Sequence, residues 1–344
     1  MSDKPTPRRP WSRRRKILLA GVIALVVLGL ALGLGLGLTL SGSDDNDNGD
    51  DNSPTLTPLP SPNTTLPWTP EVGDTWQIVL SHPPQLNASD KSVTPNVSIF
   101  DVDLFDTPTS TIEALHAMGK KVICYFSAGS YEDWRPDAKD FRTEDLGKAL
   151  DGWPGEKWIR LGSENVKGIM RKRIEMAKSK ACDGVDPDNV DGYQNDNGLS
   201  LTANESTAFM QYLSSVTRPL NMSLGLKNAG SIISAVLPLV DFSVNEQCVK
   251  YNECSKFAAF TAAGKPVFHI EYPAGDGDLQ QSIESNGFSE ETRQKFCGGE
   301  ATTGFSTVLK KMELDGWVEY CDDKVDVTDI DEGNGGPGSN GNSR

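Results

Sequence analysis

The sequence predicts an α/β fold, a (β/α)8 TIM barrel, preceded by one transmembrane helix and a disordered stalk. Three observations predict the barrel. Short apolar segments alternate with helical patterns over about 250 residues, the usual length of this fold. The apolar segments number eight. No glycine-rich phosphate-binding turn follows an early strand, although a doubly wound dinucleotide-binding sheet requires one. The barrel is therefore favoured over the doubly wound sheet.

The eight predicted strands are apolar and rich in β-branched and aromatic residues, as expected of a parallel sheet whose outer face is covered by helices. They are predicted at Trp76–Leu80, Ser98–Leu104, Val122–Ser127, Gly184–Asp188, Ser223–Lys227, Phe242–Glu246, Val267–Glu271 and Phe305–Leu309.

Helical patterns separate several of these strands. Thr202 and Glu205 have the spacing of a capping box. Apolar residues recur at helical spacing after it: Ala208, Phe209, Tyr212, Leu213 and Val216. A second helix is predicted from Val166 to Ala177, and a third from Ile112 to Met118, which Gly119 ends.

The N-terminal region has the pattern of a signal anchor. Residues 17–40 are uncharged, and as a helix rising about 1.5 Å per residue they are long enough to cross a hydrocarbon core of about 30 Å. Residues 1–16 are basic, which predicts that they stay cytoplasmic. A cleaved signal peptide has a shorter apolar core and small residues at its exit. We therefore expect a single-pass type II protein of the cell membrane, with its C-terminal body outside the cytosol.

Composition divides the rest of the chain. Residues 41–70 are acidic and then rich in Ser, Thr and Pro, which predicts an extended stalk. Residues 71–321 hold the predicted barrel. Residues 322–344 are acidic and then rich in Gly, Asn and Ser, which predicts a disordered tail.

Cysteines and glycosylation signals agree with an oxidising compartment. All six cysteines lie beyond the apolar run and are expected to pair; the spacing favours Cys248 with Cys254 and leaves the pairing of the others open. The others are Cys124, Cys182, Cys297 and Cys321. Five N-x-S/T signals predict N-glycosylation, at Asn63, Asn87, Asn96, Asn204 and Asn221.

Charge limits the partners. The formal net charge is -15, and residues 71–321 alone sum to -12. An acidic body repels phosphate backbones, so we expect no nucleic-acid partner. The three histidines, His82, His116 and His269, are far apart and belong to no HExxH motif, so no metal site is predicted.

Carboxylates dominate the predicted carboxyl ends of the strands, where barrel enzymes carry their reacting groups. Two carboxylates facing each other are what glycoside hydrolysis requires, because one protonates the leaving oxygen and the other attacks or activates water. The pair predicted to react is Asp188 and Glu246. The residues predicted to bind substrate are Asp103, Tyr125, Asp186, Tyr193, Lys227, Asn228, Glu271 and Tyr272.

Four segments resemble glycoside hydrolase family 114, the endo-α-1,4-polygalactosaminidases. They are residues 125–137, 152–158, 182–193 and 244–248, and the run Asp-Pro-Asp-Asn-Val-Asp-Gly-Tyr within 182–193 is the most specific. The resemblance covers residues 74–321 and implies a (β/α)8 barrel. It also implies an Asp/Glu catalytic pair, which carries over onto Asp188 and Glu246. The membrane-anchored layout resembles the fungal members that cut galactosaminogalactan, a biofilm polysaccharide.

The resemblance implies a cationic or partly acetylated galactosamine polysaccharide as partner, which an acidic body would attract. We assign Asp188 as nucleophile and Glu246 as general acid/base, with retention as the expected outcome, and expect Lys227 to keep a catalytic carboxylate ionised. No cofactor is expected, and the catalytic domain is expected to be monomeric. Two alternatives remain: a glycosidase for another α-linked amino sugar or galactan, and a catalytically silent surface carbohydrate-binding module.

Overall fold

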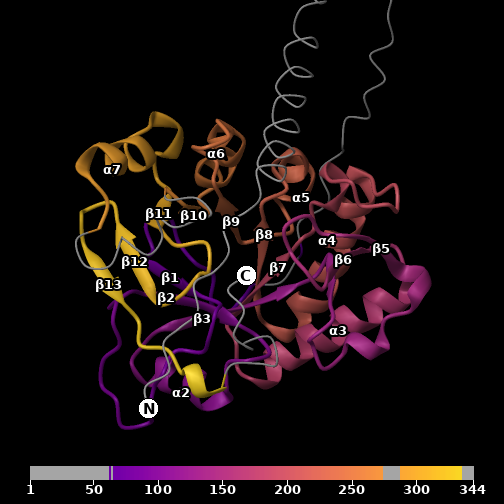
Figure 1. The fold of residues 1–344 in the computed structure, drawn as a ribbon, viewed down its shortest axis with the longest axis horizontal. Helices are drawn as coiled ribbons and strands as arrows, with labels where there is room; N and C mark the ends of the chain where they lie inside the picture. The colour runs from indigo at the N-terminus through magenta and orange to yellow at the C-terminus, as the bar shows by residue number, and fades with distance from the viewer. Residues whose placement is uncertain (1–61, 63–64, 274–286, 335–344) are drawn as a thin grey trace, which may run out of the picture. The chain divides into compact units, whose positions relative to one another are not determined.

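A computed structural model describes residue 62 and residues 65–273 and 287–334. Eight parallel strands form one sheet, in which each strand pairs with its predecessor among the eight (Figure 1). They are β1 (Trp76–Val79), β2 (Ile99–Asp103), β3 (Lys121–Ser127), β7 (Gly184–Asp188), β8 (Ser223–Lys227), β9 (Phe242–Glu246), β10 (Val267–Glu271) and β11 (Ser306–Leu309).

The predicted strands are confirmed. β7, β8, β9 and β10 have the predicted bounds, and the other four differ by one residue at one end or at both. Two further strands were not predicted: β12 (Trp317–Tyr320) and β13 (Val325–Val327) continue the sheet beyond β11 in antiparallel pairing. They escaped the sequence reading because they are short and alternate apolar with charged residues.

The sheet curls so that its two ends meet. The indole Nε1 of Trp76, in β1, donates a hydrogen bond to the carbonyl of Ser306 in β11 at 2.8 Å. The hydroxyl of Tyr320, in β12, donates to the carbonyl of Trp76 at 3.1 Å. Among the described pairings none joins β1 directly to β11, so these groups link the ends. The architecture is a TIM-like curled parallel sheet covered by helices.

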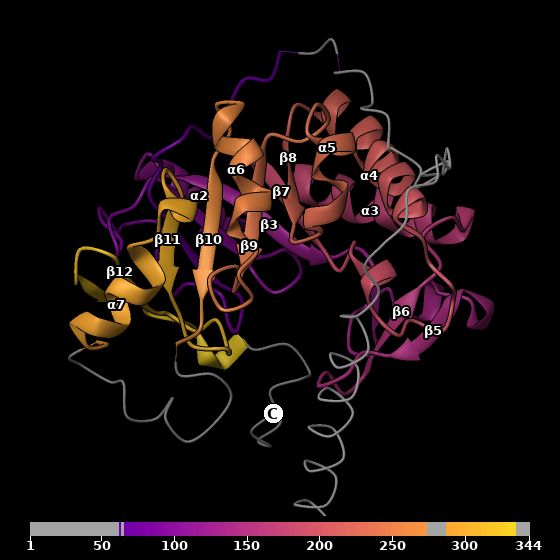
Figure 2. The same cartoon turned by 90° about the horizontal axis from the view of Figure 1, so that it is seen from above.

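Successive helices pack against one another on the outer side of the curl (Figures 1 and 2). The predicted capping box forms at α4, where Thr202 and Glu205 each bond the other's backbone amide. The bounds of the helices are α2 (Thr109–Ala117), α3 (Glu164–Ser179), α4 (Ala203–Thr217), α5 (Ile233–Val236), α6 (Cys254–Ala262) and α7 (Glu290–Cys297).

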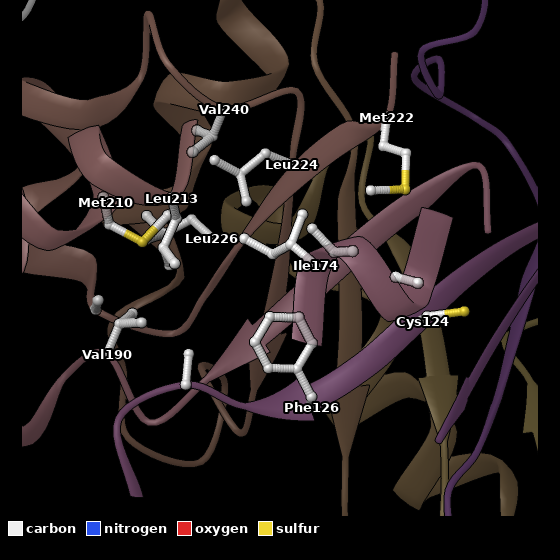
Figure 3. Close-up of a cluster of buried hydrophobic side chains, with 14 of the residues drawn as sticks. Cys124, Phe126, Ile174, Val190, Met210, Leu213, Met222, Leu224, Leu226 and Val240 are labelled. Atoms are coloured by element: carbon white, nitrogen blue, oxygen red, sulfur yellow. The ribbon is translucent and has the colours of Figure 1, made fainter. Parts of the chain in front are cut away.

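Alternate residues of each strand build two cores. Figure 3 shows part of the outer core, in which Phe126 and Leu224 from the sheet pack with Ile174 of α3 and Leu213 of α4. The inner core fills the curl with residues of the opposite parity, among them Trp76, Ile99, Ile123, Phe242 and Phe268.

The inner core requires a glycine. At Gly225 of β8 a Cβ atom would lie 2.5 Å from a ring carbon of Phe242. Phe242 also packs on Phe268, with ring centroids 5.7 Å apart. The aromatic layer thus closes the lower part of the curl and leaves the polar side chains at the carboxyl ends of the strands.

An insertion between β3 and α3 carries a second sheet. Its strands are β4 (Ser130–Glu132), β5 (Leu146–Ala149) and β6 (Glu156–Ile159), in the order β4-β6-β5 with antiparallel pairing. Because it follows the carboxyl end of β3, the insertion lies at the end of the main sheet to which the parallel strands point (Figure 2). The small sheet was not predicted.

Two predicted boundaries need correction. Trp68, assigned to the stalk, belongs to the folded body: its carbonyl accepts a hydrogen bond from Ser223 Oγ at 2.8 Å, and Lys121 lies over its ring. The disordered tail was placed too early, because β13 pairs with β12 and Ile330 bridges to Pro84. Thr328, between them, is buried against Gln77.

The predicted segments 1–16 and 17–40, most of the stalk and residues 335–344 lie outside the described residues. Within the described ranges, no helix is both long and apolar enough to cross a membrane.

Candidate active site

Five polar side chains meet where β3, β7, β8, β9 and β10 end. Tyr125, Asp188, Lys227 and Glu246 lie on or at the end of a strand, and Tyr272 directly follows β10. All have the parity of the inner core, so each points into the curl. The structure thereby brings together the predicted catalytic pair and three of the predicted substrate-binding residues.

Lys227 lies between the two carboxylates. Its Nζ is 3.2 Å from Asp188 Oδ2 and 3.3 Å from Glu246 Oε2, and its side chain is only 2% exposed. Burial by itself would lower the pKa of Lys227, but the nearby carboxylates outweigh it and raise the pKa well above its usual value. The ammonium therefore stays charged and holds the two carboxylates at one site.

Glu246 accepts hydrogen bonds on both oxygens. Tyr272 donates to Oε1 at 2.5 Å, and Asn228 Nδ2 donates to Oε2 at 3.1 Å. Asn228 Oδ1 also accepts the backbone N–H of Glu246 at 2.9 Å. Burial favours the neutral carboxyl, yet Lys227 and these donors outweigh it and lower the pKa of Glu246. In the free protein the Glu246 carboxyl is thus held ionised at neutral pH.

Both oxygens of the Asp188 carboxylate accept hydrogen bonds too. Tyr125 donates to Oδ2 at 2.9 Å, and the backbone N–H of Asn189 donates to Oδ1 at 2.7 Å. Burial, followed by the charge of Asp188, raises the pKa of Tyr125 well above its usual value, so the phenol remains a donor. The Asp188 side chain keeps 16% of its surface exposed, and that of Glu246 keeps 24%.

The backbone turns in the same unusual way after each central residue. Asn189, Asn228 and Gln247, which directly follow Asp188, Lys227 and Glu246, have φ angles of 61°, 49° and 60°. Left-handed backbone is uncommon outside glycine, and asparagine tolerates it best. Such conformations are concentrated at functional sites, where surrounding contacts enforce them.

The insertion is joined to this site by a chain of hydrogen bonds. Asn189 Nδ2 donates to Ser127 Oγ at 2.9 Å and to Ser130 Oγ at 3.3 Å, and Ser130 Oγ donates to Glu156 at 2.8 Å. Gly129 donates its N–H to the Asp188 carbonyl at 2.9 Å. A Cβ at Gly129 would lie 1.7 Å from the Asn189 carbonyl oxygen, so only glycine permits this approach.

Asp103 belongs to a different group, which we call the arginine cluster: Arg135 and Arg173 with Asp103, Glu132 and Asp137. Arg135 binds both oxygens of Asp103, at 3.0 and 2.6 Å. Two backbone amides donate to Asp103 Oδ1 as well. Both oxygens of Asp103 are therefore engaged by protein groups, and the cluster fastens the insertion to β2 and α3. The substrate contact of Asp103 stays a prediction.

Asp186 does point inward, but below the site. Together with Asp101 of β2 it is fully buried, and no described N–H or O–H group of another residue donates to their four oxygens. Burial, then Asp186, raises the pKa of Asp101 well above its usual value, and burial raises that of Asp186 to about 7. A proton held between them stabilises the pair. None of the surface of Asp186 is exposed, and its substrate contact stays a prediction.

Glu271 and Tyr193 are also placed away from the central group. Glu271 precedes Tyr272 and so has the opposite parity; it is fully buried and accepts bonds from Val249 N–H at 2.7 Å and His269 at 3.0 Å. Its substrate contact stays a prediction. Tyr193 bonds Ser231 and remains half-exposed in the loop after β7.

Asp191 was missed by the sequence reasoning. It is partly buried, its carboxylate accepts a hydrogen bond from its own backbone N–H, and no ion pair engages it among the described residues. Burial and the charge of Asp188 raise the pKa of Asp191 to about 6, and the charges of Lys227 and Glu246 also act on it. The sequence did offer a signal for it, because Asp191 is the last acid of the Asp-Pro-Asp-Asn-Val-Asp run.

The six cysteines form three disulfides. The favoured pair Cys248–Cys254 is confirmed, and the open pairings are Cys124–Cys182 and Cys297–Cys321. Cys248 and Cys254 lie near His269 in the only arrangement of metal-binding type within the described ranges. Because both sulfurs are bonded to each other, this group does not offer thiolates to a metal.

Four of the five predicted glycosylation sites are described, and each presents an exposed asparagine: Asn87, Asn96, Asn204 and Asn221. Asn63 lies outside the described residues.

Comparisons with known proteins agree on one family. The model of glycoside hydrolase family GH114 matches residues 57–326. A crystal structure of Aspergillus fumigatus Ega3 in complex with galactosamine is 50% identical, with a TM-score of 0.70, over 75% of this chain and 99% of that one. The glycoside hydrolase domain of PelA from Pseudomonas aeruginosa is 12% identical, with a TM-score of 0.51 over the same shares, and shows the fold alone. No curated protein matches the chain.

Proposed function

Since the chain belongs to glycoside hydrolase family GH114 and is a glycoside hydrolase, we propose that it cleaves α-1,4-linked galactosamine polymers internally. In this proposal Asp188 and Glu246 are the reacting carboxylates. One observation carries their assignment. A single buried ammonium, that of Lys227, lies within 3.3 Å of both, and both keep exposed surface at the mouth of the curl.

The proposed reaction has two steps. The reaction starts from the form of the protein in which Glu246 carries a proton, the minor form of the free protein at neutral pH. Asp188 attacks the anomeric carbon while the protonated Glu246 gives its proton to the departing glycosidic oxygen, which leaves as the new chain end. Glu246, now ionised, then takes a proton from water, whose oxygen displaces Asp188 from the anomeric carbon. Lys227 and Tyr125 both contact Oδ2 of Asp188 and hold the carboxylate in place for the attack.

The spacing supports retention of configuration. Asp188 Oδ2 and Glu246 Oε2 both contact Lys227 Nζ, so they cannot be farther apart than these two contacts laid end to end. Retaining glycosidases place their carboxyl groups about 5–5.5 Å apart, and inverting ones about 6.5–9.5 Å. The largest possible distance between these two oxygens therefore lies at the lower bound of the inverting range.

An amino sugar suits the charge of the site. The 50% identical Ega3 structure contains galactosamine. In this chain the central lysine is already shared by two carboxylates, whereas no ion pair engages the Asp191 carboxylate among the described residues. We therefore assign Asp191 to the ammonium group of the bound sugar. Lys227 is the one cation among the main charges that act on Asp186, Asp191 and Glu246, which favours a cationic substrate.

The experiment incubates the full chain with α-1,4-galactosamine oligomers and polymer, fully deacetylated or acetylated, and follows chain length by mass spectrometry. Internal cleavage of the deacetylated chain is expected, and loss of cleavage in Asp188→Asn and Glu246→Gln. Asp196→Asn is the matched control, because Asp196 is an exposed carboxylate paired with Lys148 outside the site.

Azide separates the two roles. With an activated α-galactosaminide, Glu246→Ala should be rescued to an α-glycosyl azide through the Asp188 intermediate, and Asp188→Ala to the β-azide by direct displacement. The opposite pattern would exchange the roles. Binding of the polymer by folded protein without any product would instead support a silent carbohydrate-binding module, and cleavage only of other α-linked sugars would change the substrate.

We also propose that residues 17–40 anchor the protein in the cell membrane, with residues 1–16 in the cytoplasm and the catalytic body outside as a monomer. The uncharged run and its basic flank support the anchor, and three disulfides support an oxidising compartment. The test is carbonate extraction of membranes with protease protection. Extraction into the soluble fraction would contradict an anchor, and light scattering of the purified chain would check the monomer.

A further inference from the structure

We propose that the turn holding Trp153, with Asp133 and Asp151 beside it, is a second binding site for the galactosamine polymer, outside the catalytic centre. The proposal rests on the proposed function. In it, a sugar unit away from the cleaved bond places its C–H face on the Trp153 indole, and its ammonium group pairs with the neighbouring carboxylates.

Exposed aromatic residues are restricted to one end of the molecule. Of all Phe, Trp and Tyr side chains in the described ranges, only Trp153 and Tyr251 are exposed, at 50% and 60%. Trp153 lies in the insertion after β3, and Tyr251 lies in the loop between β9 and α6. Both connections follow carboxyl ends of parallel strands, the end that carries Asp188 and Glu246. Half of the Trp153 surface is thus open to solvent at that end.

The turn presents the indole in a fixed way. Trp153 N–H donates to the Leu150 carbonyl and Glu156 N–H to the Trp153 carbonyl, both at 3.2 Å. Gly152 and Gly155 have backbone φ angles of 83° and 94°, which residues other than glycine rarely adopt. A preformed aromatic surface loses little conformational entropy when a sugar binds to it.

Acidic groups flank the turn. Asp133 packs directly against it: a Cβ at Gly155 would lie 2.8 Å from Asp133 Oδ1. Asp133 and Asp151 are both exposed, and neither carboxylate has an ion-pair or hydrogen-bond partner among the described residues. An indole face and unpaired carboxylates together suit a ligand that carries both an apolar face and a cation.

The turn is also continuous with the catalytic centre. Glu156, three residues after Trp153, bonds Ser130, which accepts from Asn189, the residue after Asp188. A polymer bound in the catalytic centre and on the turn would thus span one surface at the carboxyl end of the sheet. Tyr251 differs, because Lys250 lies 5.2 Å from its ring centroid and would repel a cationic sugar.

The test compares chain-length dependence in the full chain, kept in mild detergent because of residues 17–40. The substrates are deacetylated α-1,4-galactosamine oligomers of increasing length and the polymer. Trp153→Ala is expected to lower kcat/KM on the polymer about tenfold, chiefly through KM, with the loss shrinking toward the shortest oligomer that is still cut. Trp153→Tyr should retain most of the activity.

Two further sets of variants sharpen the test. The double variant Asp133→Asn, Asp151→Asn should weaken polymer binding most at low salt, as screening predicts. Tyr251→Ala is the matched control, an exposed aromatic at the same end, and should resemble wild type at every length. In the Asp188→Asn background, calorimetric titration with uncleaved polymer should show the same loss of affinity on Trp153→Ala.

Three results would overturn the inference: an unchanged polymer kcat/KM in Trp153→Ala, an equal loss at all lengths, or an equal loss in Tyr251→Ala. If the wild type is active and Trp153→Ala cleaves equally well, only the proposed second binding site is refuted. Wild type that neither cuts nor binds galactosamine chains would remove the proposed function itself.

Discussion

Two buried ion clusters lie at the same end of the sheet and differ in how their charges are matched. The arginine cluster has two cations for three acids, with the guanidinium groups in direct contact with every acid. The group around Lys227 has one cation between two carboxylates, above a buried Asp pair that receives no donor. The charges of the first cluster are nearly balanced, whereas the second group has an excess of acids.

The comparison teaches how structural and reacting acids differ when residue type and strand position are alike. Asp103 and Asp188 both end a parallel strand and both have the inward parity. Asp103 has a bidentate arginine and 5% exposure of its side chain; Asp188 shares a lysine and has 16%. Saturated counter-charge marks a structural acid, because it leaves no acceptor for substrate.

The largest expected effects come from replacing Asp188 and Asp103, one at a time, by asparagine. Asp188→Asn should lower kcat on the order of 10³-fold or more, with little change in stability, because it removes the attacking group. Asp103→Asn should cost about 3 kcal/mol of unfolding free energy, because it leaves Arg135 undercompensated in a buried site. Steady-state kinetics and urea unfolding measure the two quantities. A kinetic loss of similar size in folded Asp103→Asn would erase the distinction.

Arg173→Met tests the structural cluster directly. The side chain is fully buried and binds Asp137 at 2.8 Å and the Ser127 carbonyl at 2.6 Å. Its loss leaves Asp137 without a cation and Glu132 with Arg135 alone, so a decrease of about 3–5 kcal/mol in unfolding free energy is expected. Arg171→Met, on the exposed face of the same helix, is the control. Equal stability of the two variants would show that the cluster does not hold the insertion.

Lys227→Met tests the shared cation through pH dependence. In the native site Lys227 helps to lower the pKa of Glu246, so the acid form is lost early as pH rises and kcat/KM falls on the alkaline side. Without the ammonium Glu246 keeps its proton to higher pH, and the alkaline limb should move up by about one unit or more. Lys227→Arg should leave the limb near its native position. A limb that stays in place in Lys227→Met would separate Glu246 from the acid role.

Asp191→Asn has the smallest expected effect and concerns selectivity. The ratio of kcat/KM for deacetylated over acetylated oligomers should fall about tenfold, because the carboxylate no longer attracts the sugar ammonium. In wild type the same preference should weaken below about pH 6, where Asp191 gains its proton. The variant should lack this pH dependence, and Asp196→Asn should keep it. A ratio unchanged at every pH would remove Asp191 from sugar recognition.

Much of the fold followed from local pattern. Four strands, β7 to β10, have the predicted bounds, and the capping box of Thr202 and Glu205 forms as predicted. Long apolar segments and local hydrogen bonds are strong signals because neighbouring residues suffice to produce them. β12 and β13 lack that signal: β12 is stabilised by pairing with β11, and β13 by pairing with β12.

The candidate site also combines residues that the local pattern predicted with features that depend on tertiary structure. The pattern indicated Asp188, Glu246 and Lys227 because each ends an apolar strand, and the structure brings these three together. Glu271 and Tyr272 were both selected although they are adjacent, and period-two alternation allows only one of them to face inward. The alternation of inward and outward residues along the strand would have been enough, from the sequence alone, to show that Glu271 and Tyr272 point in opposite directions.

The sequence by itself determined the strand–helix order, the strand ends that carry acids, and the chemistry of a carboxylate pair. Only the tertiary structure decided which acids are free to react. That depends on counter-charge from distant segments: Arg135 of the insertion neutralises Asp103 of β2, while Asp188 and Glu246 must share Lys227. Electrostatic interactions act through space between residues far apart in the chain, and no local pattern encodes them.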